Sequence, residues 1–419
     1  MITKSLNKFP NKVKEFKFIG HNKEQCIFDG KKYNIERKRN QYGHRYFKYD
    51  EVFEYSLIED ELNSNNLKHT KYSYCIFLKI INIEKQTFNN LDFSNSLFID
   101  KVTLQDLTFN SKVDFYNSTF LSDVKICNVN FLGDTNFMHT IFKSDLYFHN
   151  VYFKRNLSFE NCDFAANAWF ADSEFIEEVN FNFSVFEKLA NFQESKFNKS
   201  YFNYATFNGK VIFAYSEFKN TVNFKDVFFK DYLDLRYIIE DKSCVFDFSG
   251  SHIESLNYSE TKFNKFANRE TALFFKEHAL KQNDQIRALE FYKKEMDSYC
   301  SDLNEEKNWT DLTILKFEKW FSNYGTDPLI PIIYILLISF IFSLFISYNI
   351  ERFDISFNNS LLLINPTLSV SDIFEITLPT FDIKKIPSYL EIINLFKNIF
   401  FAILIYETIK SFRKFSRKL

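Results

Sequence analysis

Residues 168–186 read AWFADSEFIEEVNFNFSVF, and this stretch decides the fold. Phenylalanine recurs in it in alternating steps of five and six residues. The same alternation extends from Leu104 to Leu235 and defines a ladder of 25 positions, of which 22 are Phe. One step departs from it, because Phe202 follows Phe197 by five residues where six are expected. Such regularity indicates an internal structural repeat, which governs every other fold assignment.

A second rule accompanies the ladder. The residue two positions before each ladder residue is always Val, Leu, Ala, Ser, Thr or Cys, as in Ala168 before Phe170. A spacing of two places both side chains on one face of an extended segment. An amphipathic helix would instead need apolar residues every three or four positions. The pattern therefore predicts a solenoid of short strands, whose Phe rings stack in columns with coils roughly 4.8 Å apart.

These motifs resemble those of pentapeptide-repeat proteins, in the variant with alternating five- and six-residue spacing. Val179-Asn180-Phe181 and Ser216-Glu217-Phe218 carry the match, and the resemblance covers roughly residues 85–262. It implies a right-handed quadrilateral β-helix with four faces and about 22 residues per coil. It implies no particular function. An ordinary β-sandwich with Phe-rich strands is the alternative, and its turn spacing would be irregular.

A coil of 22 residues predicts which side chains lie above one another. Arg155, Glu177 and Lys199 each follow a ladder Phe by two positions. We therefore expect them to form a vertical column of alternating charge on the surface of the solenoid.

The N-terminal 80 residues do not follow the ladder and are interpreted as a cap for the exposed strand edge. Phe16–Ile19, Cys26–Phe28 and Tyr72–Ile83 are expected to form short strands. The metal-ligand types nearby, His21, Cys26 and His44, match no metal motif. The six cysteines include no CxxC pair, which argues against a disulfide framework or zinc site.

The region after the repeat changes to helical periodicity. Asn268–Tyr299 lacks Gly and Pro and has apolar residues at three- and four-residue spacing. Within it, His278, Asn283 and Asp284 are interpreted as the polar face of a capping helix rather than as a chemical site. A second amphipathic segment, Trp309–Phe321, leads to the helix stop at residues 323–325.

Two later segments are candidate membrane spans. Pro328–Ile350 contains no charged residue, and its 23 residues are enough to cross a bilayer. Leu390–Thr408 is interrupted by three charged residues, so its support is weaker. Five of the last ten residues are basic, which favours a cytoplasmic C-terminus. These features predict a membrane hairpin, with the β-helix on the cytoplasmic side and the loop 351–389 on the extracytoplasmic side.

A polar stripe marks the second span, where Glu391, Asn394, Lys397 and Asn398 share one helical face. The stripe could line a lumen in an oligomer, pack on the preceding loop or lie at the headgroups. In the loop, Ser369 and Asp372 form a helix start, and Phe374–Phe381 is apolar enough to dip into a bilayer. No glycine follows Gly325, so a potassium-type filter is absent.

No motif for phosphate binding, metalloprotease or serine hydrolase chemistry occurs, and we predict no enzyme, cofactor, metal or catalytic residue. The expected role is a membrane-anchored scaffold in the inner or plasma membrane, which presents the β-helix to a protein partner and contacts lipid through residues 328–350 and 390–408. The alternatives are a two-span pore or membrane effector, which would assemble as a homo-oligomer, and a DNA mimic that binds topoisomerase. Residues 88–262 hold 24 acidic and 16 basic side chains, a mild net charge of −8, and nucleic acid is not an expected partner.

The sequence thus predicts an all-β solenoid followed by an α-helical region with two transmembrane helices. The expected division is an N-terminal cap (1–80), the pentapeptide-repeat β-helix (81–262), a helical cap or linker (263–327), transmembrane helix 1 (328–350), an extracytoplasmic loop (351–389), transmembrane helix 2 (390–408) and a basic cytoplasmic tail (409–419).

Overall fold

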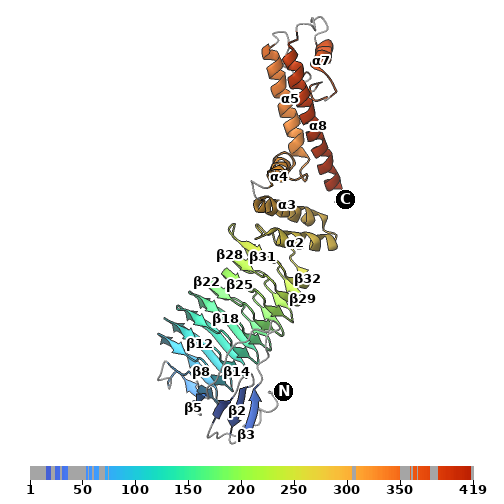
Figure 1. Cartoon of the computed structure of the whole chain (residues 1–419). Coiled ribbons are helices and arrows are strands. Elements are labelled where there is room, and N and C mark those ends of the chain that lie inside the picture. The colour runs from blue at the N-terminus through green and yellow to red at the C-terminus, as the bar shows by residue number, and fades with distance from the viewer. Residues whose placement is uncertain are drawn as a thin grey trace. The chain divides into compact units, whose positions relative to one another are not determined.

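A computed structural model of the chain describes residues 16–19, 24–28, 31–35, 53–54, 56–58, 61–65, 71–73, 75–303, 308–349, 359, 362–365, 367–377 and 386–416. The chain divides into two compact units, Met1–Ala267 and Asn268–Leu419. The first contains the strands and the second the helices (Figure 1).

The first unit begins with a small antiparallel sheet. Its four strands are β1 (Phe16–Ile19), β2 (Glu24–Phe28), β3 (Lys31–Ile35) and β4 (Phe53–Glu54), in the order β3-β2-β1-β4. The strands expected at Phe16–Ile19 and Cys26–Phe28 are therefore present. Cys26 lies in β2, whereas His21 and His44 fall outside the described residues.

All later strands belong to one 28-stranded sheet that coils into a solenoid, visible as stacked short arrows in Figure 1. Its first strands, β5 (Ser56–Ile58) and β6 (Leu62–Asn63), pair in parallel with β7 (Cys75–Phe77) and β8 (Ile81–Glu84). The parallel ladder thus begins before residue 81, where the repeat was expected to start, because Ile76 and Phe77 already pair with Leu97 and Phe98.

The remaining strands repeat a regular scheme, in which a longer strand covers two faces and two-residue strands cover the others. In chain order they are β9 (Thr87–Phe88), β10 (Leu91–Asp92), β11 (Leu97–Phe98), β12 (Val102–Phe109), β13 (Val113–Asp114), β14 (Thr119–Phe120), β15 (Val124–Phe131), β16 (Thr135–Asn136), β17 (Ile141–Phe142), β18 (Leu146–Phe153), β19 (Leu157–Ser158), β20 (Asp163–Phe164), β21 (Ala168–Trp169), β22 (Glu174–Asn180), β23 (Val185–Phe186), β24 (Ala190–Asn191), β25 (Lys196–Tyr201), β26 (Thr206–Phe207), β27 (Val211–Ile212), β28 (Glu217–Asn223), β29 (Phe228–Asp234), β30 (Ile239–Glu240), β31 (Val245–Asp247) and β32 (His252–Asn257).

The register confirms the coil length of about 22 residues. Phe109 pairs with Phe131, and Phe131 pairs with Phe153. All 25 ladder positions are at most 2% exposed. The rings stack as predicted, and those of Phe115 and Phe137 lie 4.7 Å apart with an interplanar angle of 6°. The Phe columns therefore form the core of the solenoid.

The structure explains why small residues occur two positions before the ladder residues. At several corners this residue is a serine that lies in the core and bridges successive coils. The Ser184 hydroxyl donates to the carbonyl of Phe159, at 2.5 Å, and accepts the N–H of Cys162, at 3.0 Å. An apolar side chain in place of Ser184 would remove the hydroxyl that bonds to these two buried backbone groups.

The short step from Phe197 to Phe202 produces one coil of 21 residues. The register shifts between Phe175 and Glu178, so that Lys199 lies opposite Glu178 and not opposite Glu177. The Lys199 Nζ accordingly pairs with the Glu178 carboxylate at 3.0 Å. The prediction of a column of Arg155, Glu177 and Lys199 is wrong for Lys199. The segment from Phe197 to Lys199 is one residue shorter than the segment from Phe175 to Glu178 with which it pairs.

The second unit contains the helices α2 (Arg269–Lys281), α3 (Gln285–Asp302), α4 (Trp309–Ser322), α5 (Leu329–Asn349), α7 (Val370–Thr377) and α8 (Ser388–Ser416). Between α2 and α3, Asn283 adopts a left-handed conformation and the Asp284 carboxylate accepts the N–H of Arg287 at 3.0 Å. These two residues therefore terminate one helix and cap the next. The helices α5 and α8 are both long and apolar enough to cross a membrane.

Candidate functional site

The helices α5 and α8 pack side by side (Figure 1). Many of their large apolar side chains are exposed. Nineteen large hydrophobic side chains on these two helices are exposed by 37% to 88%, among them Phe340, Ile341, Phe396 and Ile399. The buried polar side chains of the same helices face inward and include Ser339, Ser343, Asn394, Lys397, Glu407 and Ser411. This arrangement reverses the usual distribution of polar and apolar residues in a protein that folds in water.

The polar stripe predicted on the second span meets the segment that connects the two helices. The Asn394 side chain donates to the carbonyl of Leu368 at 3.1 Å, and Lys397 Nζ donates to the carbonyl of Leu363 at 2.7 Å. Asn398 reaches the same carbonyl of Leu368 at 3.5 Å. Of the three arrangements left open by the sequence, packing on the loop is the one found.

Glu391, the first member of the stripe, caps α7. Its carboxylate accepts the N–H groups of Val370, at 3.2 Å, and Ser371, at 3.0 Å, and also the hydroxyl of Ser371. Unpaired N–H groups and the positive end of the helix dipole favour a carboxylate at this position. The short helix is thus held to α8 by its N-terminus.

The start of α7 has a reciprocal cap of its own. The N–H of Ser369 donates to the Asp372 carboxylate at 2.8 Å, and the N–H of Asp372 donates to the Ser369 hydroxyl at 3.0 Å. The hydrogen bond from Ser369 lowers the pKa of Asp372. This confirms the helix start predicted at these two residues. Phe374 packs in an apolar cluster with residues of α5 and α8, and residues 378–381 lie outside the described part of the chain.

Lys397 is the most unusual member of the stripe. Its side chain is only 7% exposed, and its ammonium lies 4.9 Å from the ring centre of Phe342 and 5.2 Å from that of Phe401. Across the residues that the structure describes, it forms no ion pair. The charge is therefore stabilised by two aromatic faces and one carbonyl oxygen, contacts that are stronger away from water.

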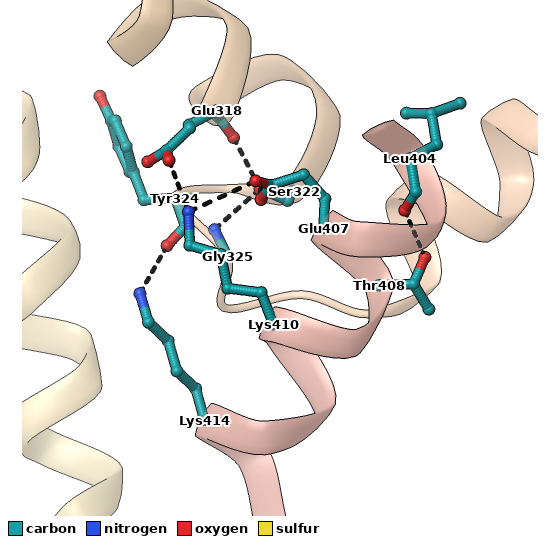
Figure 2. Close-up of polar contacts among 9 residues, drawn as sticks. All are labelled: Glu318, Ser322, Tyr324, Gly325, Leu404, Glu407, Thr408, Lys410 and Lys414. Atoms are coloured by element: carbon teal, nitrogen blue, oxygen red, sulfur yellow. Dashed lines mark hydrogen bonds and ion pairs between the residues drawn. The ribbon is translucent and has the colours of Figure 1, made fainter. Parts of the chain in front are cut away.

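A second polar cluster joins the opposite end of α8 to α4 (Figure 2). The Ser322 hydroxyl donates to the Glu407 carboxylate at 2.7 Å and accepts the N–H of Gly325 at 2.8 Å. The Lys410 ammonium pairs with Glu318 on α4 and with Glu407 on its own helix. Two acids and one base thus neutralise each other in part at a boundary between helices.

The turn between α4 and α5 is shaped to receive this cluster. Gly325 has a φ of +66°, and a Cβ there would lie 3.0 Å from Cε of Lys410, so the turn leaves room for the lysine stem. The carbonyl of Tyr324 accepts a hydrogen bond from Lys414 Nζ at 3.0 Å, as Figure 2 shows.

The buried Tyr324 side chain extends the cluster to α3. Its hydroxyl donates to the Asp297 carboxylate at 2.9 Å, and Lys319 pairs with the same carboxylate at 2.6 Å. Burial raises the pKa of Tyr324, so the phenol remains a donor at neutral pH. The turn therefore links α3, α4 and α8 through polar contacts.

Sequence reasoning identified the stripe but missed this junction. A usable signal existed, since Glu407 and Lys410 stand three residues apart on a helix face, just as Glu318 and Ser322 stand four apart. Within the described ranges, no group of three or more His, Cys, Asp or Glu side chains could hold a metal ion. The contacts of both polar clusters are helix caps, hydrogen bonds to backbone carbonyls and ion pairs, and these contacts hold helices together.

One comparison with known proteins identifies the repeat. A family model described as "Pentapeptide repeats (9 copies)" matches residues 181–227 and 192–238. No curated protein and no solved structure matches the chain significantly. The matched residues lie in the solenoid and include its 21-residue coil, across which the Phe columns continue, as in the stack of Phe192 on Phe213. The chain therefore carries a pentapeptide-repeat β-solenoid, followed by helices of which two could span a membrane.

Proposed function

We propose that this protein is a membrane-anchored scaffold, in which α5 and α8 form the anchor and the solenoid presents a rigid surface to a protein partner. The observation that supports the anchor best is the reversed hairpin, with apolar side chains outward and Asn394, Lys397 and Glu407 inward. In water such a surface would favour aggregation, whereas in lipid it faces a solvent of its own polarity.

The dimensions of α5 fit this role. Its 21 residues give a length of about 31 Å, close to the roughly 30 Å hydrocarbon core of a bilayer. Tyr348 is exposed near its C-terminal end, and the Tyr389 hydroxyl donates to the Asn349 side chain at 2.7 Å. Trp320 is exposed in α4, shortly before α5 begins. Tyr and Trp prefer the two interfaces of a membrane, which supports a span between them.

The orientation follows from the basic tail. Lys410, Arg413, Lys414, Arg417 and Lys418 lie next to the end of α8, and basic residues are retained on the cytoplasmic side. The solenoid and the C-terminus would then be cytoplasmic, in an inner or plasma membrane, and the segment between α5 and α8 extracytoplasmic.

Cysteine labelling tests this orientation. Burial raises the pKa of Cys75 to about 11 and raises the pKa of Cys162 well above its usual value, so these thiols react poorly at neutral pH and can be retained. In a chain with the other accessible cysteines replaced by serine, a cysteine at Asn358 should react with an impermeant thiol reagent in intact cells. One at Ser416 should react only after lysis. The reverse pattern would place the solenoid outside.

A pore is the second candidate, because the stripe on α8 is polar. In a single chain, however, Asn394 and Lys397 already bind the backbone of the connecting segment, which leaves them unable to line a lumen without rearrangement. Purified protein in planar bilayers should therefore show no conductance above background. Discrete conductance steps that disappear in the Asn394→Leu, Lys397→Leu double variant would contradict the anchor and support a pore.

A further inference from the structure

The corners of the solenoid contain two columns of residues with left-handed backbone. Every second ladder position is followed, two residues later, by a residue with φ between +52° and +62°. One column contains Asn95, Asn117, His139, Asn161, Phe183, Tyr204 and Asp226, and the other contains Asp106, Asn128, Asn150, Asp172, Glu194, Tyr215, Tyr237 and Glu260.

The residue types change along both columns. The early coils use mostly Asn and Asp, which tolerate this conformation, and their side chains bond to each other, as in Asn150 to Asn128 at 2.9 Å. The later coils include one Phe and three Tyr at these corners, and bulky residues seldom adopt a positive φ. Backbone strain of this kind persists where another requirement selects the side chain, and it is concentrated at functional sites.

Tyr215 and Tyr237 form the more open of the two aromatic pairs. Their rings are parallel within 5°, with centres 4.8 Å apart, and the side chains are 51% and 43% exposed. The coil before Tyr215 places Glu194 in the same column, and the coil after Tyr237 places Glu260 there. Ile239 adds a third exposed apolar side chain at this corner. We call Glu194, Tyr215, Tyr237, Glu260 and Ile239 the tyrosine corner.

In this column Glu194 precedes Tyr215 by one coil, and Glu260 follows Tyr237 by one coil, so the stacked pair has a carboxylate on either side. A planar cation that continued the stack by one layer would contact a tyrosine face and the adjacent carboxylate together. Guanidinium is planar, so it can stack flat on an aromatic ring and pair with a carboxylate through two parallel N–H groups, whereas an ammonium is a compact point charge that lacks this geometry. Arg236, the nearest basic residue in sequence, is already bound to Asp234 at 2.7 Å. Lys196, which pairs in register with Glu217, carries no planar group.

We propose that the tyrosine corner binds an arginine-bearing segment of a partner protein. The inference deepens the scaffold function and rests on it, since it assigns the surface and the partner chemistry that the scaffold would use. Arginine side chains would stack on Tyr215 and Tyr237 and pair with Glu194 and Glu260. The mild negative charge of residues 88–262 would attract such a segment without selecting arginine over lysine.

The test uses full-length protein in neutral detergent and two fluorescent peptides, octa-arginine and octa-lysine, at a salt concentration of about 0.15 M, which screens distant charges. The parent protein should bind octa-arginine at least tenfold more tightly than octa-lysine. The Tyr215→Asn, Tyr237→Asn variant should lose this preference while it retains its melting temperature, because Asn occupies the equivalent corners 128 and 150.

The Phe183→Asn, Tyr204→Asn variant is the matched control, because it makes the same change in the other column and should keep the preference for arginine. Equal affinities of the parent for the two peptides, an unchanged preference in the tyrosine variant, or equal losses in both variants would overturn the proposal. Anchoring is measured separately, by flotation of the same proteins with vesicles. A chain that binds octa-arginine but does not float would contradict the anchor and leave the tyrosine corner supported.

Discussion

The solenoid and the helical hairpin solve the same packing problem in opposite ways. In the solenoid, Phe side chains point inward and Asn, Asp, Lys and Glu occupy the corners. In the hairpin, 19 large apolar side chains are exposed, while Asn394, Lys397 and Glu407 are buried together with apolar residues such as Phe342 and Leu404. The comparison supports the proposed anchor, because exposed apolar side chains are favourable in lipid and unfavourable in water.

Individual buried polar side chains in both parts bond to the backbone of another segment. In the solenoid, the hydroxyl of Ser195 is satisfied by the carbonyl of Phe170 in the preceding coil, at 2.6 Å. In the hairpin, Lys397 is satisfied by a carbonyl of the connecting segment, at 2.7 Å. The difference lies in the source of the partner, since the repeat supplies one in every coil and the hairpin must recruit a separate segment.

The largest effect is expected in the Phe core. Phe170 is fully buried and stacks between Phe148 and Phe192, so Phe170→Ala should reduce the free energy of unfolding by about 3–5 kcal/mol. Phe183 lies at a corner, stacks on one side with Tyr204 and has a strained φ of +59°, so Phe183→Ala should cost much less. Chemical denaturation of both variants measures this difference. Similar losses would show that the ladder does not separate core from surface.

An intermediate effect is expected inside the hairpin. Lys397→Met keeps most of the side-chain volume but leaves the carbonyl of Leu363 without its donor, which should cost about 1–3 kcal/mol. Ile399 is an outward residue on the same helix, and Ile399→Met should change stability by less than about 0.5 kcal/mol. Thermal unfolding in detergent provides the measurement. A larger loss for Ile399→Met would reverse the assignment of inner and outer faces.

Much of this comparison could be predicted from the sequence. The ladder predicted the buried Phe positions, because a fixed side-chain spacing is a local property of an extended chain. The partner of Lys199 was mispredicted, because one coil is a residue shorter than the others. The sequence does not show at which corner the register shifts, since that depends on how the shorter coil pairs with its neighbour. The stripe on α8 was visible, but its partners Leu363 and Leu368 contribute backbone carbonyls, which no side-chain pattern identifies.

The smallest effect concerns the cap of α7 and tests where water reaches the hairpin. The pKa of Asp372 is lowered because its carboxylate accepts the N–H of Ser369. A carboxyl group with a lowered pKa in the folded state stabilises the protein above its unfolded pKa of about 3.9, and this stabilisation is lost as the pH falls through the folded value. The protection of residues 367–377 against hydrogen exchange, corrected for the intrinsic rate, should therefore decrease below pH 4. In Asp372→Asn the side chain can still accept the hydrogen bond but has no charge to lose, so the protection should not depend on pH in this range.

Because Ser369 and Asp372 are exposed, external acid should reach them in intact vesicles whose solenoid faces the lumen at pH 7. If acid acted only after the vesicles were opened, the α7 segment would lie on the same side of the membrane as the solenoid, and α5 and α8 would not cross it as a hairpin.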